Sequence, residues 1–443
     1  MKDKKISNLI KKEEKRQREG IELIPSENYA SSEVRKVLSS YYVNKYSEGY
    51  PKKRYYGGNE NVDQVEILCQ ERAKELFKVP FANVQPYSGS PANLAVYLAT
   101  CHPGDVVSGQ ALIAGGHLTH GHHVSATGIY YKTFQYGLIK EHVYDGKVDD
   151  LFDYEQIKKI AKTYQPKLIW VGATAYPLII HFEKFAKIAD EIGAYLAADI
   201  AHIAGLIAAG VHPSPVPYVH IVTTTTHKTL RGPRGAMIMV TKKGLAKDKL
   251  LAEKIDRAVF PGLQGGPHNN NIAALAIALK EAASPSFRLY AKQTVKNSQV
   301  LARELIKYGF KLIGNGSENH MIWIDSSNKN LDGWTLAWAL EASGIIANRQ
   351  TIPFDKKPAY YPSGLRLGTP ALTTRGMKEK EMILIAGWIN QVVNHLGKMN
   401  LADLGSRNKE KDQLARKAFK QEVFKDLFLL GIKAKVKKLC QRF

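Results

Sequence analysis

The chain has 443 residues, 44% of them hydrophobic, and its 63 Lys and Arg residues against 41 Asp and Glu residues give a net charge of +22. This length and apolar content exclude general disorder and allow at least one sizeable core, divided between two or three domains. The longest apolar runs are shorter than a membrane span and contain His and Gly, so we expect a soluble protein with no membrane partner.

Two further features favour a reducing cytoplasm. The first twenty residues lack the apolar core of a secretory signal, and their Lys/Glu mixture is wrong for an organelle transit peptide. The three cysteines, Cys69, Cys101 and Cys440, show neither disulfide nor metal-ligand spacing. We therefore predict a cytoplasmic protein.

A Gly-rich stretch without periodicity, NKYSEGYPKKRYYGG, lies near the amino terminus and supplies Tyr46, Glu48, Tyr55 and Tyr56. Such a segment is more typical of an extended arm than of a core element. We therefore assign residues 1–58 to an amino-terminal arm and helix.

Short β-rich runs alternate with helical stretches between residues 59 and 282. This alternation predicts a large α/β domain with a mainly parallel central sheet and helices on both faces. Functional side chains are then expected at the carboxyl ends of the strands. The predicted strands include DVVSG (105–109), KLIWVG (167–172), AYLAAD (194–199), HIVTTTT (220–226) and GAMIMV (235–240).

The segment Ser88-Gly89-Ser90-Pro91 joins a strand-like run to the helical stretch PANLAVYLAT. We predict that Ser90 is the N-cap and that Pro91 is the first helical residue. Free backbone N–H groups and two hydroxyls would then face a phosphate dianion. The alternative is an ordinary helix start.

The segment AGGHLTHGHH contains four histidines, His117, His120, His122 and His123. A metal site is one interpretation, but no acidic residue or cysteine occurs between Asp105 and Glu141. We therefore expect no metal. Instead we expect His117 to stack on an aromatic cofactor, because the glycines before it let the backbone come close.

A carboxylate and a lysine follow two successive predicted strands, since Asp199 ends AYLAAD and Lys228 follows HIVTTTT. One βαβ unit would place both in the same cleft. A desolvated lysine can form a Schiff base with an aldehyde cofactor, and a carboxylate can keep the pyridine nitrogen of pyridoxal phosphate charged. The structural alternative is that Asp199 caps a helix and Lys228 is exposed.

The pattern changes in residues 283–443, which predict a smaller α+β domain. Within PSGLRLGTPALTTRG, Arg366 lies between two leucines, where a merely solvated arginine is unusual. Its planar fork suits a two-point clamp on a substrate carboxylate. A structural ion pair is the alternative.

The carboxyl-terminal tail is the most basic part of the chain, with twelve Lys and Arg against five Asp and Glu residues between Leu401 and Phe443. It predicts an amphipathic helix that docks through an apolar face. The alternative is a phosphate-binding arm for nucleic acid, which no zinc-finger, RRM or helix-turn-helix signature supports. The predicted apolar face consists of Leu414, Ala415, Phe419, Val423, Phe424 and Leu427.

Taken together, eight stretches resemble the serine hydroxymethyltransferase family of pyridoxal-phosphate enzymes. They run in family order from about residue 20 to residue 395. The resemblance implies the aspartate-aminotransferase-like fold, also called fold type I. The stretches are IPSENYAS, NKYSEGYPKKRYYGG, NVQPYSGSPAN, GGHLTHG, DIAHIAGLIAAG, VTTTTHKTLRGPRG, FPGLQGGP and SGLRLGTPALTTRG.

The resemblance also implies a site for pyridoxal 5'-phosphate. Lys228 would carry the cofactor, Asp199 would pair with the pyridine nitrogen, and His117 would stack on the ring. The further cofactor contacts that it implies are Ser88, Gly89 and Ser90 at the phosphate, His202 at the ring hydroxyl, and Thr174, His227, Tyr46, Gly265 and Gly266.

Family members share each active site across a dimer, so the resemblance implies an obligate homodimer or a tetramer. Part of each site would then come from the partner subunit, namely Tyr46, Glu48, Tyr55, Tyr56, Gly265 and Gly266. The amino-acid substrate would contact Ser26 and Arg366. The folate would lie along Leu112, Gly116, Leu118, Gln350, Pro358, Ala359 and Tyr360.

The implied activity is the reversible conversion of L-serine and tetrahydrofolate to glycine and 5,10-methylenetetrahydrofolate. Glu48 would handle a proton at the substrate hydroxyl and the folate, or would simply tie the arm to the pocket. The alternatives are a folate-independent pyridoxal-phosphate aldolase acting on threonine or allo-threonine, and a nucleic-acid-binding protein that uses the basic tail. The implied catalytic set is Lys228, Glu48, His117, Asp199, His202 and Tyr56.

Three positions depart from the usual family pattern. Tyr87 replaces a His and Pro25 replaces an Ala, and both lie beside predicted site residues. Gln350 replaces an Asn that helps to bind the pterin. Because the extra methylene displaces the amide, we expect folate binding to differ more than cofactor binding.

Overall fold

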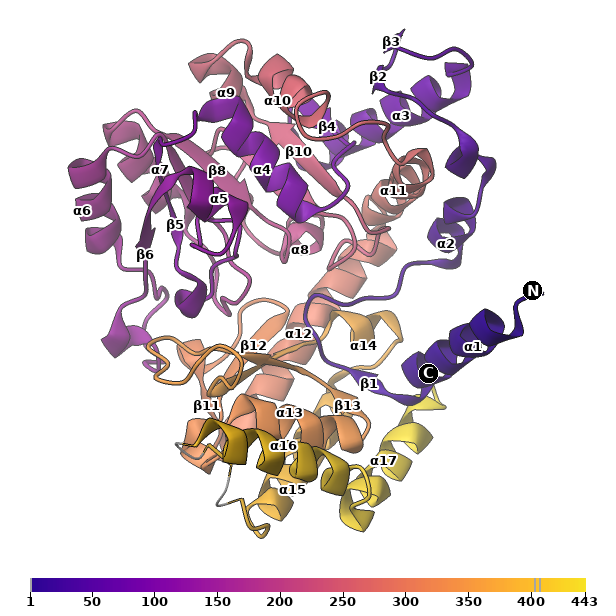
Figure 1. Ribbon diagram of the computed structural model, residues 1–443, viewed down its shortest axis with the longest axis vertical. Helices are drawn as coiled ribbons and strands as arrows, with labels where there is room; N and C mark the ends of the chain where they lie inside the picture. Colours follow the sequence, from indigo (N-terminus) through magenta and orange to yellow (C-terminus); the bar gives the residue numbers. More distant parts are fainter. Residues whose placement is uncertain (1, 402–403, 406–407) are drawn as a thin grey trace. The chain divides into compact units, whose positions relative to one another are not determined.

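The chain folds into two compact units, as seen in the computed structural model drawn in Figure 1. The large unit is Asn28–Lys292, and the small unit combines Met1–Glu27 with Gln293–Phe443. The structure describes residues 2–401, 404–405 and 408–443, so positions 402–403 and 406–407 of the predicted basic tail lie outside it. The division into residues 1–58, 59–282 and 283–443 stays a prediction.

The large unit contains a seven-stranded mixed sheet, which confirms the predicted α/β class. The neighbouring pairs β5–β6, β5–β7, β7–β8 and β8–β9 are parallel, whereas β10 runs antiparallel to β4 and β9. In spatial order the strands are β4 (Phe81–Asn83), β10 (Ala236–Val240), β9 (Ile221–Thr225), β8 (Tyr195–Asp199), β7 (Leu168–Val171), β5 (Val106–Gln110) and β6 (Lys132–Tyr136).

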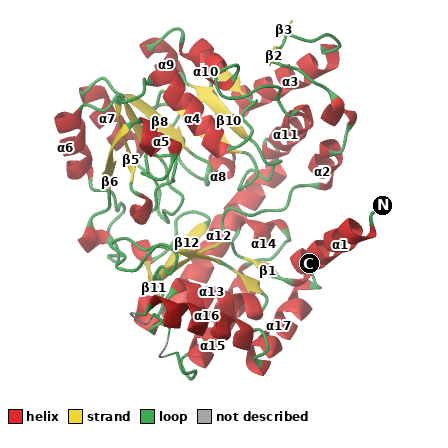
Figure 2. Ribbon diagram, in the orientation of Figure 1, coloured by secondary structure: helices red, strands yellow, loops and turns green. Residues whose placement is uncertain are grey.

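Helices surround this sheet, as Figure 2 shows by colour. Strands β7, β9 and β10 are buried along their whole length, and the sequences of β7 and β10 are accordingly apolar throughout. The helices are α2 (Ser32–Leu38), α3 (Glu60–Phe77), α4 (Gly89–Thr100), α5 (Ala126–Tyr130), α6 (Tyr154–Tyr164), α7 (Phe182–Glu191), α8 (Ala204–Ala208), α9 (Lys242–Lys247), α10 (Leu251–Val259) and α11 (Asn269–Ala282).

Helices α4 and α10 pack on each other, and both contact β10, where their apolar residues join one core cluster. Helix α4 begins two residues earlier than its sequence suggests. Ser88 occupies the N-cap and Gly89 is the first helical residue. The predicted N-cap Ser90 and first residue Pro91 were therefore wrong, because both already lie within the first turn.

The predicted arm folds as a small hairpin, formed by β2 (Gly49–Tyr50) and β3 (Lys53–Arg54). Its two strands are only two residues long each, so backbone pairing alone gives it little stability. Side-chain contacts with the rest of the large unit therefore decide its conformation.

The small unit contains a four-stranded antiparallel sheet in the order β11 (Lys311–Leu312), β12 (Met321–Asp325), β15 (Gly364–Gly368) and β14 (Asn348–Gln350). A separate parallel pair joins β1 (Ile21–Glu22) to β13 (Ile345–Ile346). The long helix α12 (Pro285–Lys307) connects the two units along the chain. The other helices are α1 (Lys4–Glu19), α13 (Gly333–Ala342), α14 (Pro370–Thr374), α15 (Glu379–Leu396), α16 (Lys409–Val423) and α17 (Leu427–Cys440).

The tail forms two helices, α16 and α17, that pack on the small unit, which agrees with the docked-helix interpretation. Phe419 and Val423 belong to the core, as do five residues of α17, the last of them Cys440. Leu414 and Leu427 were wrongly placed on the apolar face, because they are 63% and 85% exposed. The chain turns between the two helices, so a single helical period does not run through both. No helix among the described residues has the length and hydropathy of a membrane span.

Arg416 fastens α16 to the small unit. Its buried guanidinium pairs with Asp332 at 2.8 Å and with Asp412 at 3.0 Å. The same group lies 4.0 Å from the ring centroid of Tyr361, in cation–π geometry. One of the cations in the basic tail, Arg416, therefore lies in a buried structural contact.

Replacing Arg416 with Met should lower the free energy of unfolding by about 3–5 kcal/mol, because Asp332 and Asp412 would keep buried charges without a partner. Urea titration measures this loss. The exposed neighbour Lys417→Met is the matched control and should change it by less than about 0.5 kcal/mol. Equal unfolding curves for both variants would contradict the anchoring role.

Candidate active site

The centre of the site is Asp199, the last residue of β8. Its Oδ2 accepts hydrogen bonds from Asn93 Nδ2 at 2.9 Å and is 3.2 Å from His120 Nε2. Its Oδ1 accepts the backbone N–H of Ala201 at 3.0 Å. Both carboxylate oxygens are therefore held, and the side chain has one orientation.

The surroundings of Asp199 keep it ionised. Burial alone would raise its pKa, but the hydrogen bond from His120 and the charges of His120, His117 and Lys228 outweigh burial. The pKa of Asp199 consequently lies well below its usual value of 3.8. A carboxylate of this kind can stay charged opposite a basic ring nitrogen throughout the physiological range.

Asn93 connects this carboxylate to the neighbouring strands. It also donates to Thr119 Oγ1 at 2.8 Å, and it accepts from Thr223 Oγ1 at 2.7 Å. Thr223 is the residue of β9 that pairs with Asp199 in the sheet register. The amide is therefore satisfied on both sides, so it cannot turn away from the carboxylate.

Lys228 follows β9 by three residues, and its side chain is half-buried. Its backbone carbonyl accepts a hydrogen bond from Asn28 Nδ2 at 2.9 Å. The next residue, Thr229, donates to the carbonyl of His202 at 2.9 Å, which joins the segments that follow β8 and β9. The predicted neighbours Asp199, His202 and Lys228 thus lie in one region of the large unit.

His117 lies on a loop that the glycines before it bring close to the sheet. The Gly115 carbonyl accepts the N–H of Thr174 at 2.8 Å, and a Cβ on Gly116 would overlap the carbonyl oxygen of Gln110. His117 Nδ1 lies 2.7 Å from Thr119 Oγ1, which fixes the ring plane. The loop therefore presents an oriented, half-buried imidazole.

The donor atoms of His117, His120 and Asp199 all lie within 4.8 Å of one another, which is close enough for a cation. The sequence has no acidic residue near these histidines, but the fold places Asp199 of β8 beside them. His120 Nε2 already bonds the carboxylate, and His117 Nδ1 already bonds Thr119. The expectation that the site holds no metal stays a prediction.

The predicted phosphate cradle lies at the amino terminus of α4, where Ser88 and Ser90 are exposed. A Cβ on Gly89 would lie only 2.8 Å from Thr225 Cγ2, so the end of β9 closes one side of the turn. Two residues further on, His227 Nδ1 is buried and has no hydrogen-bond partner within the described residues. Burial, aided by the charges of Lys228 and Arg234, lowers the pKa of His227 to about 3.

These features fit pyridoxal phosphate. An ionised carboxylate, a half-buried amine and an oriented imidazole are the groups that its pyridine nitrogen, aldehyde and ring face require. Backbone N–H groups at a helix start suit its phosphate. The buried, unpartnered nitrogen of His227 is the kind of atom that a bound polar group satisfies.

A second cluster lies on the hairpin that carries Glu48. Tyr46 Oη is 3.4 Å from Glu48 Oε1, and the rings of Tyr46 and Tyr56 meet edge to face at 5.1 Å. A Cβ on Gly265 would lie 3.0 Å from Glu48 Oε1, and one on Gly266 would lie 3.2 Å from the ring of Tyr46. The structure thus brings these five predicted residues together in one surface.

The same surface is rich in exposed aromatic side chains, because Tyr46, Tyr55 and Tyr56 are 54%, 75% and 47% exposed. The charge of Glu48 is the main cause that raises the pKa of Tyr56. Tyr87, one of the departures from the family pattern, donates to the carbonyl of Gly266 at 2.7 Å and stacks on His268 at 4.1 Å. Tyr87 therefore supports the two glycines.

The small unit holds the predicted amino-acid clamp. Arg366 lies in the middle of β15, is 6% exposed, and donates from Nε to Asn348 Oδ1 at 3.3 Å. Burial lowers its pKa to about 10, so it stays cationic at neutral pH. The Gly368 N–H donates to the Leu23 carbonyl at 2.7 Å, which brings the segment of half-buried Ser26 to the end of the same strand.

The predicted folate residues fall into both units. In the large unit, Leu112 and exposed Leu118 flank the buried Gly116. In the small unit, Gln350 is half-buried on β14 and lies 3.4 Å from Thr351 Oγ1 through Nε2. The stretch 358–360 is exposed, with Arg349 over the Tyr360 ring at 4.4 Å.

Sequence reasoning missed Asn93 and left His120 without a role, although both hold Asp199. A signal for Asn93 exists, since it is a polar residue on the buried face of an apolar helix. No sequence pattern shows which of four neighbouring histidines faces the carboxylate. His120 faces the carboxylate because its ring stacks on Trp170, with the ring centroids 5.2 Å apart and an interplanar angle of 9°.

Comparison with known proteins gives a consistent result. Residues 1–389 match the family model described as serine hydroxymethyltransferase. The chain is 52% identical to the serine hydroxymethyltransferase of Acidothermus cellulolyticus over 89% of this chain and 90% of that protein. It is also 52% identical to the serine hydroxymethyltransferase of Sorangium cellulosum, over 89% of this chain and 90% of that protein. The identity to the serine hydroxymethyltransferase of Desulfotalea psychrophila is 51%, over 89% of this chain and 89% of that protein.

Replacing His120 with Phe tests the electrostatics around Asp199. Phe keeps a ring to stack on Trp170 but removes the hydrogen bond, so the pKa of Asp199 should rise. Ionised Asp199 stabilises the fold above its unfolded pKa, and this contribution is lost as the pH falls through the folded pKa. In His120→Phe the contribution should therefore be smaller, and its loss should be complete at a higher pH. At pH 7 the free energy of unfolding should fall by about 1.5–3 kcal/mol.

Denaturant titration of the protein without cofactor, across acidic and neutral pH, measures both effects. The exposed neighbour His123→Phe is the control and should leave the pH profile as it is. A His120→Phe profile that coincides with that of the unmodified protein would contradict the assigned role of His120.

Proposed function

This chain belongs to the serine hydroxymethyltransferase family, and we propose that it interconverts L-serine and tetrahydrofolate with glycine and 5,10-methylenetetrahydrofolate, using pyridoxal phosphate on Lys228. The observation that carries the proposal is the ionised carboxylate of Asp199, held by Asn93 and His120 in one region with Lys228 and His117. A metabolic enzyme of this kind suits the cytoplasm, where its free cysteines stay reduced.

The cofactor would be held mainly by the large unit. Lys228 would bind its aldehyde carbon, Asp199 its ring nitrogen and His117 one ring face, with His202 and Thr174 near the ring substituents. Its phosphate would meet the start of α4 and His227. When bound, pyridoxal phosphate supplies an electron sink that weakens the bonds at the substrate α-carbon.

The protein's own groups then have separate tasks. Asp199 keeps a proton on the ring nitrogen, because its own pKa is far too low to take that proton. His117, fixed by Thr119, keeps water from one side of the ring. Glu48 holds or passes a proton at the serine hydroxyl, and Tyr56, in contact with Tyr46, limits where that carboxylate can point.

Arg366 and Ser26 would recognise the amino acid. A buried, charged guanidinium binds a carboxylate more strongly than an exposed guanidinium does, because water competes less for its hydrogen bonds. The folate would lie along Leu112, Gly116 and Leu118 and along Gln350 and residues 358–360. The longer amide of Gln350 changes the proposed contact with the pterin, so aldol cleavage without folate is the second candidate function.

We also propose a homodimer. Tyr46, Tyr55 and Tyr56 expose their rings together beside Gly265 and Gly266, and an aromatic surface of this kind is typical of a subunit contact. In a dimer this surface would meet the cofactor region of the partner subunit. Gel filtration coupled to light scattering reports the subunit number.

Replacing Lys228 with Ala should abolish the visible absorbance of the bound cofactor and serine turnover together, because the amine is the covalent attachment point. An absorbance spectrum of the purified protein, titrated with glycine and then with a reduced folate, measures this. The exposed Lys242→Ala is the control. An unchanged spectrum in Lys228→Ala would refute the assignment of the cofactor lysine.

Replacing Glu48 with Gln should keep the cofactor absorbance and lower kcat for serine by about a hundredfold to a thousandfold, since a positioned acid or base contributes at least that much. Glycine formation from serine, with and without tetrahydrofolate, measures it, and Glu60→Gln at the exposed start of α3 is the control. Equal rates with and without folate in the unmodified enzyme would favour the aldolase over the transferase.

A further inference from the structure

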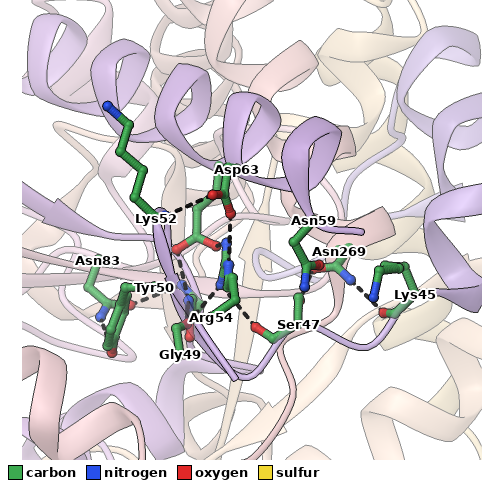
Figure 3. A network of polar contacts seen from close by, with 12 residues as sticks. Lys45, Ser47, Gly49, Tyr50, Lys52, Arg54, Asn59, Asp63, Asn83 and Asn269 are labelled. Carbon is green, nitrogen blue, oxygen red and sulfur yellow. Dashed lines mark hydrogen bonds and ion pairs between the residues drawn. The ribbon is translucent and has the colours of Figure 1, made fainter. Parts of the chain in front are cut away.

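Arg54, on the hairpin strand β3, is a buried arginine with a full set of polar partners (Figure 3). Its side chain is only 4% exposed. Nε pairs with Asp63 Oδ1 at 2.9 Å, and one terminal nitrogen pairs with Glu66 Oε2 at 2.6 Å. Both carboxylates lie on α3, so the guanidinium is fixed to the rigid part of the large unit.

The other terminal nitrogen of Arg54 points back into the hairpin. It donates to the carbonyl of Ser47 at 2.9 Å and to the carbonyl of Gly49 at 2.7 Å. These two carbonyls belong to the residues immediately before and after Glu48. One nitrogen atom therefore holds the backbone on both sides of the proposed proton-handling residue.

Further buried contacts lead to the same short stretch of backbone. Gln85 Nε2 donates to the Gly49 carbonyl at 3.0 Å and to Glu66 Oε1 at 2.8 Å. Burial raises the pKa of Glu66, but the charge and hydrogen bond of Arg54 oppose this. Arg54 and Gln85 together satisfy a carboxylate that is 0% exposed, which makes the network rigid.

The ends of the stretch are held as well. Ser47 Oγ donates to Asn269 Oδ1 at 2.6 Å, while Asn269 Nδ2 donates to the Lys45 carbonyl at 2.6 Å. Tyr50 donates to the Asp256 carbonyl at 2.6 Å. Figure 3 shows these side chains arranged along the arm, on both sides of the Arg54 contacts.

We propose that Arg54 is a positioning residue that fixes the backbone of Glu48 and so aims its carboxylate. This inference rests on the proposed function, which gives Glu48 its role at the substrate hydroxyl. A guanidinium is required because it forms two ion pairs and two carbonyl contacts in one plane, whereas a lysine amine offers three donors on a flexible stem. The carboxylate then meets Gly265 and Tyr46 in a single orientation.

The test compares Arg54→Lys with Arg72→Lys. Arg72, on the same helix as Asp63 and Glu66, donates instead to the carbonyl of Ala276 on α11 at 2.6 Å. Arg54→Lys should lower kcat for serine by about tenfold to a hundredfold, the cost of misplacing a reacting group by about an ångström. Its KM for serine should change by less than about threefold, and Arg72→Lys should change neither constant.

The same substitution in a Glu48→Gln background separates positioning from general destabilisation. If Arg54 acts through Glu48, adding Arg54→Lys should lower the residual turnover, followed with labelled serine, by less than about twofold. An equal loss in both backgrounds, or no loss in the unmodified background, would overturn the proposal.

Hydrogen exchange followed by mass spectrometry tests the same idea without any activity. In Arg54→Lys, exchange should rise in peptides covering residues 45–56 and stay the same elsewhere. A rise spread over the whole large unit, or none in the arm, would overturn the positioning role. If the unmodified enzyme does not transfer the hydroxymethyl carbon to folate, the proposed function is refuted. The hydrogen-exchange result still shows, independently of activity, whether Arg54 orders the arm.

Discussion

The site depends on one buried negative charge. Asp199 lies at the end of a central strand, where burial alone would raise its pKa. The hydrogen bond and charge of His120, with the charges of His117 and Lys228, reverse that outcome, while Asn93 donates to the same carboxylate. The sheet, helix α4 and the histidine loop each supply one of the groups that meet there. Their packing therefore keeps a carboxylate charged at the position where the proposed function places the ring nitrogen of the cofactor.

The arm also depends on a buried charge that its neighbours compensate, but here the charge is positive. Arg54 is a buried cation, and Asp63, Glu66 and two backbone carbonyls compensate it. A hairpin of two two-residue strands is not stable by backbone pairing alone, so the contacts of this buried charge stabilise it in place of an apolar core. The resulting order reaches Glu48, which in the proposed function needs both a fixed position and access to the substrate.

Local pattern predicted much of the fold because buried strands are short β-rich runs, and five such runs became the parallel strands β5, β7, β8 and β9 and the antiparallel strand β10. The start of α4 and the apolar face of the tail were less predictable. The start of α4 was hard to predict because several neighbouring residues can adopt the backbone angles of a helix end. The apolar face of the tail was hard to predict because the chain turns between α16 and α17. Leu414 and Leu427 follow a helical period but have no surface to cover.

The sequence by itself determined the family and the mainly parallel sheet, and it predicted the candidate reactive groups, because motif, strand pattern and residue type are local properties. Only the tertiary structure decided that Asn93 and His120, rather than other polar neighbours, hold Asp199, and that Arg54 lies between the carbonyls around Glu48. Such partners come from segments far apart in the chain. Which donor meets which acceptor therefore depends on packing, and no spacing along the sequence encodes it.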